Sequence, residues 1–475
     1  MSDGDKLQLT RRGILAGIGV TGVGVMLAAC GQATMAEPEA ADEEMAEEAK
    51  PKAEEAAAEK EPVHIRYGTW LNARQLENYP DTLVAPFEET HPGITVEVIH
   101  NMHAYQESFR TAFAAGEQPD AAWEADNATY LLGYFVDLAD YIKRDNFDLS
   151  HYPQHIFNSI SRIRNEINSL PNQTGGNMMA LPYNREIIEK AGLNEPSATW
   201  GDPEWNWDAY IDMAKKTTVT EGGNIATMGA SNMGTGALVG NLPFLWGGQW
   251  VSDDRRTAVC DSPETMACYS DYFSMVHEHG AMLKPGQGAD LFGEGSIVNL
   301  FYQGKLAFLN TLSSGTFGDM MQRIRDEDLP IDFAPLPTVE TTASFQWTDA
   351  NGVVTNADHP EEAWQYVAWQ GSTLNWAAGK GTIPMRADLM EQWANETFPD
   401  LKDKVRLDVI VNVLDHPGGY DPGWVVPNFA FSGSAEVKEW LSNVYGGTAG
   451  VEEGLLALKP QIQAILDDTE EKYKG

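Results

Sequence analysis

Cys30 is the first residue of this 475-residue chain whose type and setting point to a defined chemistry. It ends the run Leu27-Ala28-Ala29-Cys30, after an apolar stretch that starts beyond Arg11-Arg12. A basic start, an apolar segment and small residues before a cysteine are typical of a removable export signal that ends in a lipid-attachment site. The sequence therefore predicts a signal peptide at 1–29 and a lipid on Cys30, which holds the mature chain at the extracytoplasmic face of the cell membrane.

Two features of this segment leave alternatives open. The stretch Thr10-Arg11-Arg12-Gly13-Ile14-Leu15 resembles a twin-arginine signal, which exports folded proteins, although a general secretory signal also begins with basic residues. The apolar run is near the lower length limit of a membrane-spanning helix, so an uncleaved anchor is the alternative to cleavage. Both alternatives keep the folded part of the chain at a membrane surface.

A second set of candidate residues combines aromatic rings with polar side chains. The chain has 14 tryptophans, and several follow predicted strands, where α/β proteins form ligand sites. Sugars offer apolar C–H faces and hydroxyl groups, so a sugar site needs rings for stacking and carboxylates or amides for directed hydrogen bonds. The first candidates of this kind are Trp70 and Asn72, and then Trp123, Asp126 and Asn127.

The elements that position these residues alternate between strand and helix. Strands are predicted at 63–68, 94–99 and 119–123, with helical segments at 83–90 and 108–115 between them. This order predicts an α/β lobe with a mostly parallel sheet. Further along the chain we expect an extended crossing segment at 179–184 and strands at 304–310 and 331–334. Helices are expected at 185–191, 200–216, 360–370 and 451–466.

Composition adds bounds on the organisation and the partners of the chain. Residues 30–62 are rich in Glu and Ala and poor in large apolar side chains, which predicts a disordered tether. The remaining length exceeds what one hydrophobic core usually serves and predicts two lobes. The formal net charge of −38 argues against nucleic acid and anionic lipid as partners. Of the three cysteines, Cys260 and Cys268 are left as a disulfide or as two buried thiols.

Four phrases of the chain resemble the extracellular solute-binding proteins of ATP-driven importers, the family that includes maltose-binding protein. The resemblance implies a two-lobed α/β fold of the type II periplasmic-binding-protein class, in which hinge-connected lobes enclose the ligand and the closed form docks on a permease. The phrases are Ala180-Leu181-Pro182-Tyr183-Asn184, Gly304-Lys305-Leu306-Ala307-Phe308 with Phe333-Ala334-Pro335-Leu336-Pro337, His359-Pro360-Glu361-Glu362-Ala363-Trp364 with Gly381-Thr382-Ile383-Pro384, and Gly446-Gly447 with Val451-Glu452-Glu453-Gly454-Leu455.

Carried onto this chain, the resemblance implies one lobe of 63–180 plus 344–397 and another of 181–343 plus 398–475. It also implies five further ligand contacts. Tyr183 lies in the crossing phrase, Trp246 precedes a Gly-Gly pair, and Trp347 follows the return crossing. Ser314 stands in the place of a Gly-Pro-Trp-like loop that lacks its tryptophan here, and Trp424 lies in a Gly/Pro loop. Asn127 stands where an arginine can occur in the family.

Each aromatic candidate has packing as its alternative, and Asp126 has helix capping or plain solvation. Helix packing is the preferred reading for Trp364, Trp369 and Trp440. No nucleophile elbow or complete phosphate loop is present, so the sequence predicts a binding protein rather than an enzyme, without cofactor or metal.

The expected partners are a sugar, permease subunits with their cytoplasmic ATPase, and the membrane through the lipid, and the protein is expected to be a monomer. A non-sugar solute such as glycerol phosphate, a polyol or a peptide-like compound is the first alternative, and a surface carbohydrate-active enzyme is the second.

Overall fold

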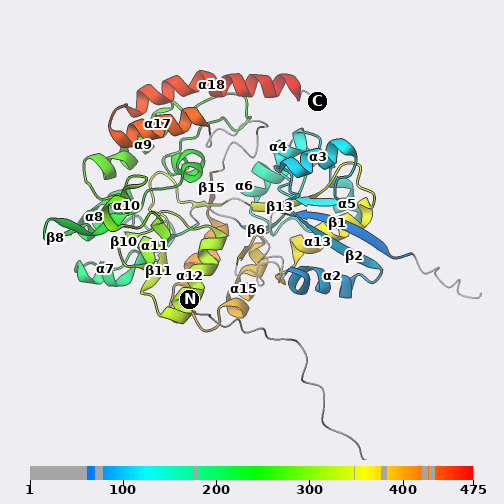
Figure 1. Ribbon diagram of the computed structural model, residues 1–475, viewed down its shortest axis with the longest axis horizontal. Helices are drawn as coiled ribbons and strands as arrows, with labels where there is room; N and C mark the ends of the chain where they lie inside the picture. Colours follow the sequence, from blue (N-terminus) through cyan, green and yellow to red (C-terminus); the bar gives the residue numbers. More distant parts are fainter. Residues whose placement is uncertain are drawn as a thin grey trace, which may run out of the picture. The chain divides into compact units, whose positions relative to one another are not determined.

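The computed structural model describes residues 61–69, 79–163, 165–174, 179–346, 348–375, 382–419, 426 and 434–473. Within them lie two main sheets with flanking helices (Figure 1). We call the six-stranded sheet and the helices packed on it the first lobe, and the five-stranded sheet with its helices the second lobe.

The first lobe has the strand order β14-β6-β13-β3-β1-β2. The three strands predicted near the start of the folded part are confirmed and pair in parallel, β1 with β2 and with β3. The later strand β13 returns antiparallel to both β3 and β6, and β14 is antiparallel to β6, so the sheet is mixed and not mostly parallel. Its strands are β1 (Val63–Thr69), β2 (Ile94–His100), β3 (Ala121–Trp123), β6 (Leu170–Thr174), β13 (Thr348–Val353) and β14 (Ile383–Pro384).

The helices of the first lobe follow the apolar spacing of the sequence. Helix α13 buries Trp364 and Val367 against the sheet, as the predicted stripe requires. The helical segments are η1 (Pro80–Val84), α2 (Ala85–Thr90), α3 (Glu107–Ala115), α4 (Asn127–Leu131), α5 (Ala139–Asp145), α6 (Gln154–Ile156), η2 (Phe157–Ser161), α13 (Pro360–Ser372), η5 (Ala387–Leu389) and α15 (Met390–Thr397). A short hairpin joins β4 (Arg162–Ile163) to β5 (Glu166–Ile167).

The second lobe has the strand order β11-β7-β10-β9-β8. The crossing strand β7 lies antiparallel between β11 and β10, whereas β10 and β9 are parallel. The strands are β7 (Leu181–Asn184), β8 (Val219–Glu221), β9 (Asn224–Ala230), β10 (Leu306–Phe308) and β11 (Ile331–Ala334). A separate parallel pair joins β12 (Ser344–Phe345) to β15 (Pro417–Gly418).

Caps set the helix limits in the second lobe. Ser262 caps α9 and Pro263 is its first residue, as predicted, whereas α8 begins at Trp207 because the Asn206 side chain accepts from the Ala209 amide, seven residues later than the predicted start at 200. The segments are α7 (Arg185–Lys190), α8 (Trp207–Thr217), η3 (Ala237–Asn241), η4 (Leu242–Trp246), α9 (Pro263–His277), α10 (Gln287–Phe292), α11 (Ile297–Tyr302), α12 (Ser314–Glu327), α16 (Leu407–Val411), η6 (Asn412–Asp415), α17 (Ala435–Gly446) and α18 (Val451–Lys472).

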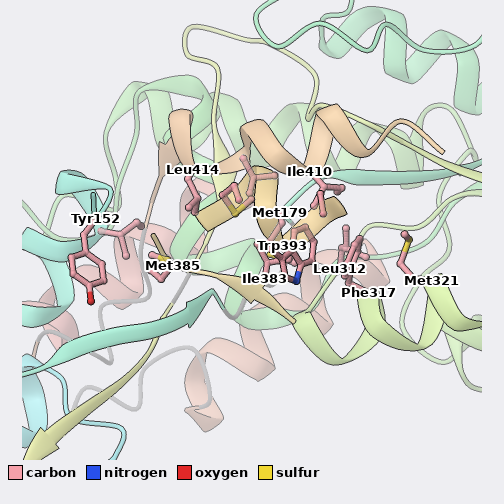
Figure 2. Packing of buried hydrophobic residues seen from close by; sticks show 14 of the residues in the cluster. Tyr152, Met179, Leu312, Phe317, Met321, Ile383, Met385, Trp393, Ile410 and Leu414 are labelled. Carbon is pink, nitrogen blue, oxygen red and sulfur yellow. The ribbon is translucent and has the colours of Figure 1, made fainter. Parts of the chain in front are cut away.

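One apolar cluster runs from one sheet to the other. It contains Ile65 of β1 and Phe333 of β11, and Ile383, Met385 and Trp393 connect them. Figure 2 shows Ile383 and Trp393 among side chains of both lobes, and the Trp393 ring lies 5.9 Å from the ring of Phe317 on α12. The two lobes are therefore joined by packed side chains as well as by chain crossings, and the exact lobe boundaries stay a prediction.

Two further sequence questions are answered in the second lobe. Cys260 and Cys268 are buried free thiols, and burial raises the pKa of both. None of the helices in the described part of the chain combines the length and the apolar character that a membrane-spanning segment needs.

Candidate functional site

An acidic recess lies at the end of β3, where the chain leaves the first sheet. It is lined by Tyr105, Glu124, Ala125, Asp126, Ile160, Thr348, Asp349 and Ala350. Three of these residues carry carboxylates, and none of the described residues that line the recess is a lysine or an arginine. The carboxyl ends of strands are where α/β sheets form ligand sites. We refer to these eight residues as the acidic recess.

Asp126 is the most deeply buried carboxylate of the recess, with 5% of its surface exposed. It caps α4 by accepting the Thr129 amide at 2.9 Å, and its other oxygen accepts the Tyr105 hydroxyl at 2.6 Å. Burial raises the pKa of Asp126 to about 7, against the lowering effect of these hydrogen bonds. The sequence left capping or ligand contact as alternatives for Asp126, and the structure shows that it caps a helix while it also lines a recess.

Tyr105 is the aromatic residue of the recess, and sequence reasoning missed it. The residue is 42% exposed, while its hydroxyl donates to Asp126. The Met102 amide donates to Thr69 and the Ala104 amide to Trp123, which fixes the loop beside β1. Gly68 permits this approach, since a Cβ there would lie 2.1 Å from the Met102 carbonyl oxygen. The sequence signal that could have identified Tyr105 is its position just after β2, at the same sheet edge as the segment after β3.

Glu124 and Asp349 complete the acidic lining. Glu124 has a left-handed backbone with φ of 63°, which is rare for a residue with a side chain, and its carboxylate pairs with His103. Asp349 accepts a hydrogen bond from the Gln173 amide, and the register of β13 shifts between Asp349 and Ala350. Backbone strain and strand irregularities both concentrate at functional sites, because they aim side chains that regular structure would not.

Asn127 was expected to contact a ligand, but the structure directs its amide to the protein. The side chain is fully buried, and its amide nitrogen donates to the carbonyls of Ser159 at 2.7 Å and Arg162 at 3.0 Å. These bonds tie α4 to the segment η2 and β4 behind the recess. Asn127 therefore holds neighbouring segments together and does not line the recess itself.

Three predicted aromatic contacts are core residues. Trp123 has no exposed surface and belongs to the core cluster of the first sheet. Trp246 donates from its ring nitrogen to Asp271 at 2.9 Å and packs edge-on against Trp207 at 4.9 Å. The Tyr183 hydroxyl lies in an ionic cluster, described next. In this conformation a ligand could reach the Trp123 and Tyr183 rings only by displacing core side chains.

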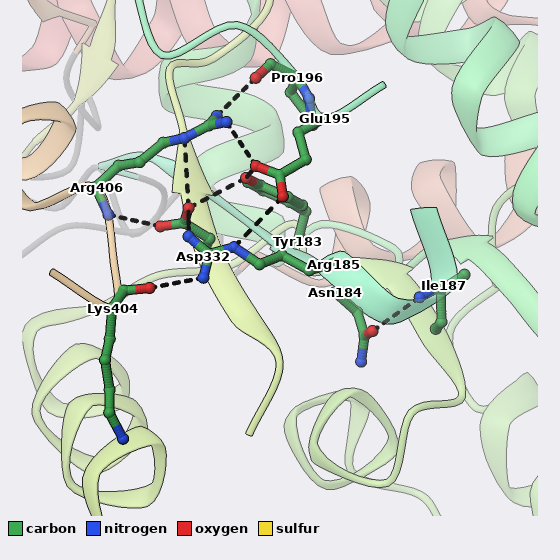
Figure 3. Close-up of polar contacts among 9 residues, drawn as sticks. All are labelled: Tyr183, Asn184, Arg185, Ile187, Glu195, Pro196, Asp332, Lys404 and Arg406. Carbon is green, nitrogen blue, oxygen red and sulfur yellow. Dashed lines mark hydrogen bonds and ion pairs between the residues drawn. The ribbon is translucent and has the colours of Figure 1, made fainter. Parts of the chain in front are cut away.

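Tyr183 lies in an ionic cluster of the second lobe that surrounds the fully buried Asp332 and reaches the surface through its other charged members (Figure 3). We call it the buried ionic cluster after Asp332 and define it as Tyr183, Arg185, Glu195, Asp332 and Arg406. The Tyr183 hydroxyl donates to Glu195 at 2.9 Å and to Asp332 at 3.2 Å. Both arginines contact Asp332, whose side chain is fully buried. Every member of the cluster is therefore bound to another member, which accounts for Tyr183 without a ligand.

The remaining tryptophans in the described part of the chain pack the lobes. Trp205 donates to the Pro335 carbonyl at 2.9 Å, and Trp364 donates to Asp145 at 2.6 Å. The Trp440 ring lies 5.8 Å from that of Trp250, and the Trp369 ring lies 5.7 Å from that of Phe87. The helix-packing interpretation is thus confirmed for Trp364, Trp369 and Trp440.

The structure does not describe the side chains of several predicted site residues. Ser314 is the first residue of helix α12, which Ser313 caps, so the expected loop is a helix start, and the Ser314 side chain is not described. The other residues of this group lie outside the described residues: Cys30, Trp70, Asn72, Trp347 and Trp424. Among the described residues, no group of three His, Cys, Asp or Glu side chains could hold a metal ion.

A cavity of about 390 Å³ lies between the two lobes beside the segment that contains Ile160. The first lobe lines it with Leu131, Asn158, Arg162 and Ile163, and the second lobe with Asp253, Asp254, Arg255, Arg256, Leu466, Thr469, Glu470 and Tyr473, together with Val426. Both lobes therefore border open space next to the recess, as a protein that binds between its lobes requires.

Comparison with known proteins places this geometry in a family. The family described as bacterial extracellular solute-binding protein matches residues 71–373. A curated binding protein from Brucella abortus is 24% identical over 249 residues, which are 50% of this chain and 52% of that protein. A Brucella suis protein matches with the same identity and coverage. The chain spans about half the length of the curated relatives it matches.

Solved structures of similar fold include proteins with different ligands. An ABC substrate-binding protein from Listeria monocytogenes in complex with cycloalternan has a TM-score of 0.65 at 20% identity, covering 86% of this chain and 100% of that one. A cyclic alpha-maltosyl-1,6-maltose binding protein from Arthrobacter globiformis has a TM-score of 0.66 at 17% identity, covering 86% and 100%. A Mycobacterium tuberculosis protein in complex with glycerophosphocholine has a TM-score of 0.66 at 16% identity, covering 85% and 98%.

These similarities show the two-lobed type II binding-protein fold that the sequence predicted. The match to the family pattern extends over more than half of the chain. The chain belongs to the family of bacterial extracellular solute-binding proteins.

Proposed function

We propose that this protein captures a carbohydrate outside the cytoplasm, an oligosaccharide or a sugar derivative, and delivers it to the permease of an ABC transporter. The observation that carries the proposal is the acidic recess, where the partly exposed ring of Tyr105 stands beside three carboxylates. A sugar ring stacks its C–H face on an aromatic side chain, and its hydroxyls donate to carboxylate oxygens. The recess, about 50 Å³ in volume, offers both kinds of partner to one edge of a saccharide.

The same lining argues against the main alternative ligand class. Glycerol phosphate or another phosphate ester would bring negative charge next to Glu124, Asp126 and Asp349, and among the described lining residues no cation compensates it. A neutral polyol fits the hydroxyl chemistry but gains little from an aromatic face. The similar Listeria monocytogenes protein was solved in complex with cycloalternan, and the Arthrobacter globiformis protein is a cyclic alpha-maltosyl-1,6-maltose binding protein, which supports the same class.

The membrane attachment is part of the proposal. The lipid on Cys30 would hold the protein at the membrane that contains the permease, and residues 30–62 would be the tether between lipid and lobes. The permease with its ATPase and the monomeric state follow from the family resemblance. Radiolabelled palmitate incorporation that is lost in Cys30→Ser would support the anchor, and labelling that persists in this variant would remove it.

A thermal-shift screen tests the ligand class, because a ligand that binds only the native state raises the melting temperature. The screen compares neutral mono- to tetrasaccharides with glycerol phosphate, sugar phosphates and short peptides. The expected result is stabilisation by a neutral saccharide that is recovered intact afterwards. Stabilisation only by phosphate esters or peptides would replace the carbohydrate assignment, and cleavage of the saccharide would favour a carbohydrate-active enzyme.

A further inference from the structure

A tight turn of the second lobe presents an arginine in an unfavourable backbone conformation. The turn spans 252–257 between the bridged residues Val251 and Ala258, and the Ser252 amide donates to Thr257 at 2.9 Å. At its tip Arg255 has a φ of 63°, in the left-handed region that favours glycine. A non-glycine residue in that region is strained and persists only where its surroundings enforce it. The arginine side chain at this position therefore calls for an explanation.

The Arg255 side chain reaches the other lobe. Its Nη2 donates at 3.0 Å to the carbonyl oxygen of Ser159 in η2 of the first lobe. The same oxygen accepts the Asn127 side-chain amide at 2.7 Å. A carbonyl oxygen has two lone pairs, so one donor from each lobe satisfies it. Asn127 thus fixes the acceptor, and Arg255 approaches it from the opposite side of the boundary between the lobes.

Both ends of this contact are braced within their own lobes. Gln463 of α18 holds the turn with two hydrogen bonds, accepting from the Ala258 amide at 2.9 Å and donating to the Arg256 carbonyl at 2.8 Å. Arg256 also pairs with Glu470 of α18 at 3.4 Å. On the other side Ser159 directly precedes Ile160, which lines the acidic recess. The acceptor of the contact is therefore one residue away from the proposed ligand site.

The surroundings of Arg255 differ from those of the apolar cluster that joins the lobes. Arg255 lines the 390 Å³ cavity between the lobes, where water is near and few apolar side chains would have to separate. Trp393 and Ile383, in contrast, are fully buried in a continuous core. Opening of the lobes thus breaks few packing contacts at the cavity, and the hydrogen bond from Arg255 is a contact that opening would remove.

We propose that Arg255 is a latch between the lobes: its bond to the Ser159 carbonyl holds the ligand-free protein closed for a larger share of the time. The apparent Kd equals the intrinsic Kd divided by the fraction of binding-competent protein, so a latch tunes affinity without touching the ligand. The inference rests on the proposed capture between two hinged lobes, although it does not depend on which solute is bound. A hydrogen bond of typical net strength corresponds to roughly a two- to tenfold shift in the ratio of closed to open protein.

The test compares Arg255→Met with Arg256→Met in the full-length chain without ligand, by small-angle X-ray scattering. Arg256 is the matched control, since it lies in the same turn and pairs within its own lobe. The expected result is a larger radius of gyration for Arg255→Met and an unchanged one for Arg256→Met. An unchanged Arg255→Met, or an equal expansion of both variants, would overturn the latch.

A second variant separates the latch from the fold of the turn. Arg255→Gly removes the donor and relieves the left-handed strain, so it should fold at least as stably as the wild type and open as much as Arg255→Met. A closed Arg255→Gly variant would contradict the proposal. Because the measurements use no ligand, failure of the latch leaves the carbohydrate assignment untouched, and a failed saccharide screen leaves the scattering result valid.

Discussion

The acidic recess of the first lobe and the buried ionic cluster of the second lobe contain the same pair of groups in opposite settings. In the recess, Tyr105 donates to Asp126 at 2.6 Å, and no arginine or lysine lines the site among the described residues. In the cluster, Tyr183 donates to Asp332 at 3.2 Å, and two arginines also contact that carboxylate (Figure 3).

The difference shows that charge compensation decides whether a buried carboxylate serves the fold or stays available to a ligand. Arg185 and Arg406 both compensate the charge of Asp332, so the carboxylate at the centre of the cluster is already paired. Asp126 lacks a cation and keeps a pKa of about 7, while the ring of its tyrosine partner stays exposed. The same hydrogen bond therefore stabilises the second lobe and leaves the recess able to gain from a partner that arrives from outside.

The largest expected effect comes from removing the charge at the centre of the cluster. Asp332→Asn removes the fully buried charge of the cluster and leaves Arg185 and Arg406 with the exposed Glu195 as their counter-charge. Breaking a fully buried pair costs about 3–5 kcal/mol, which is the upper bound for this partly exposed cluster. We expect the midpoint of urea unfolding to fall accordingly, while binding of the saccharide found by thermal shift is retained by the folded protein. A stability close to that of the wild type would show that the cluster does not hold the lobe together.

Asp126 makes the stability of the protein depend on pH, because its pKa is raised in the native state. Its pKa is about 7 in the native protein and about 4 in an unfolded chain, so between these values the unfolded chain binds fewer protons and the native state loses stability as the pH rises. The loss of stability is about 4 kcal/mol, because each of about three pKa units corresponds to about 1.36 kcal/mol; it is complete above about pH 7 and absent below about pH 4.

The variant Asp126→Asn isolates this contribution. Asparagine also caps helices, so α4 keeps its start while the titration is removed. Relative to the wild type, the variant should gain stability as the pH rises from about 4 to 7, measured by urea unfolding at several pH values. A stability difference that is constant with pH would place the Asp126 pKa near its ordinary value.

Tyr105 tests the recess as a stacking site. Tyr105→Ala removes the exposed ring, and aromatic contacts contribute about 0.5–1.5 kcal/mol beyond burial, so the Kd for the stabilising saccharide should rise up to about tenfold. Tyr302→Ala is the control, because Tyr302 likewise donates to a carboxylate, that of Asp319, at 2.9 Å outside the recess. Intrinsic tryptophan fluorescence measures both, and equal losses would argue against stacking on Tyr105.

The smallest effect is expected at an exposed ion pair. Asp328 pairs with Lys404 at 2.8 Å, but its side chain is fully solvated and salt screens the interaction. Asp328→Asn keeps a residue that tolerates the left-handed φ of 54° at this position. We expect no measurable change in the unfolding midpoint, and a large loss would mean that exposed pairs rival the buried cluster.

Much of the fold was predictable because its signals are local. The alternation of Ile65 and Tyr67 in β1 predicted a half-buried strand, and the Ser262-Pro263 start of α9 follows from capping chemistry. The segment Trp123 to Asn127 was correctly located at a strand end. Which of its side chains are buried was not predictable, because a side chain after a strand can point into the core or out of it, and only the packed sheet decides between them.

The sequence alone determined the α/β elements, the family and the segment that bears the recess, since periodicity, caps and family phrases are written in consecutive residues. The tertiary structure alone decided that Trp123 is core, that Tyr105 is the exposed ring, and that Arg255 meets a carbonyl 96 residues away in the chain. Those outcomes depend on which distant backbones the topology brings within hydrogen-bond reach, and no local pattern encodes that distance.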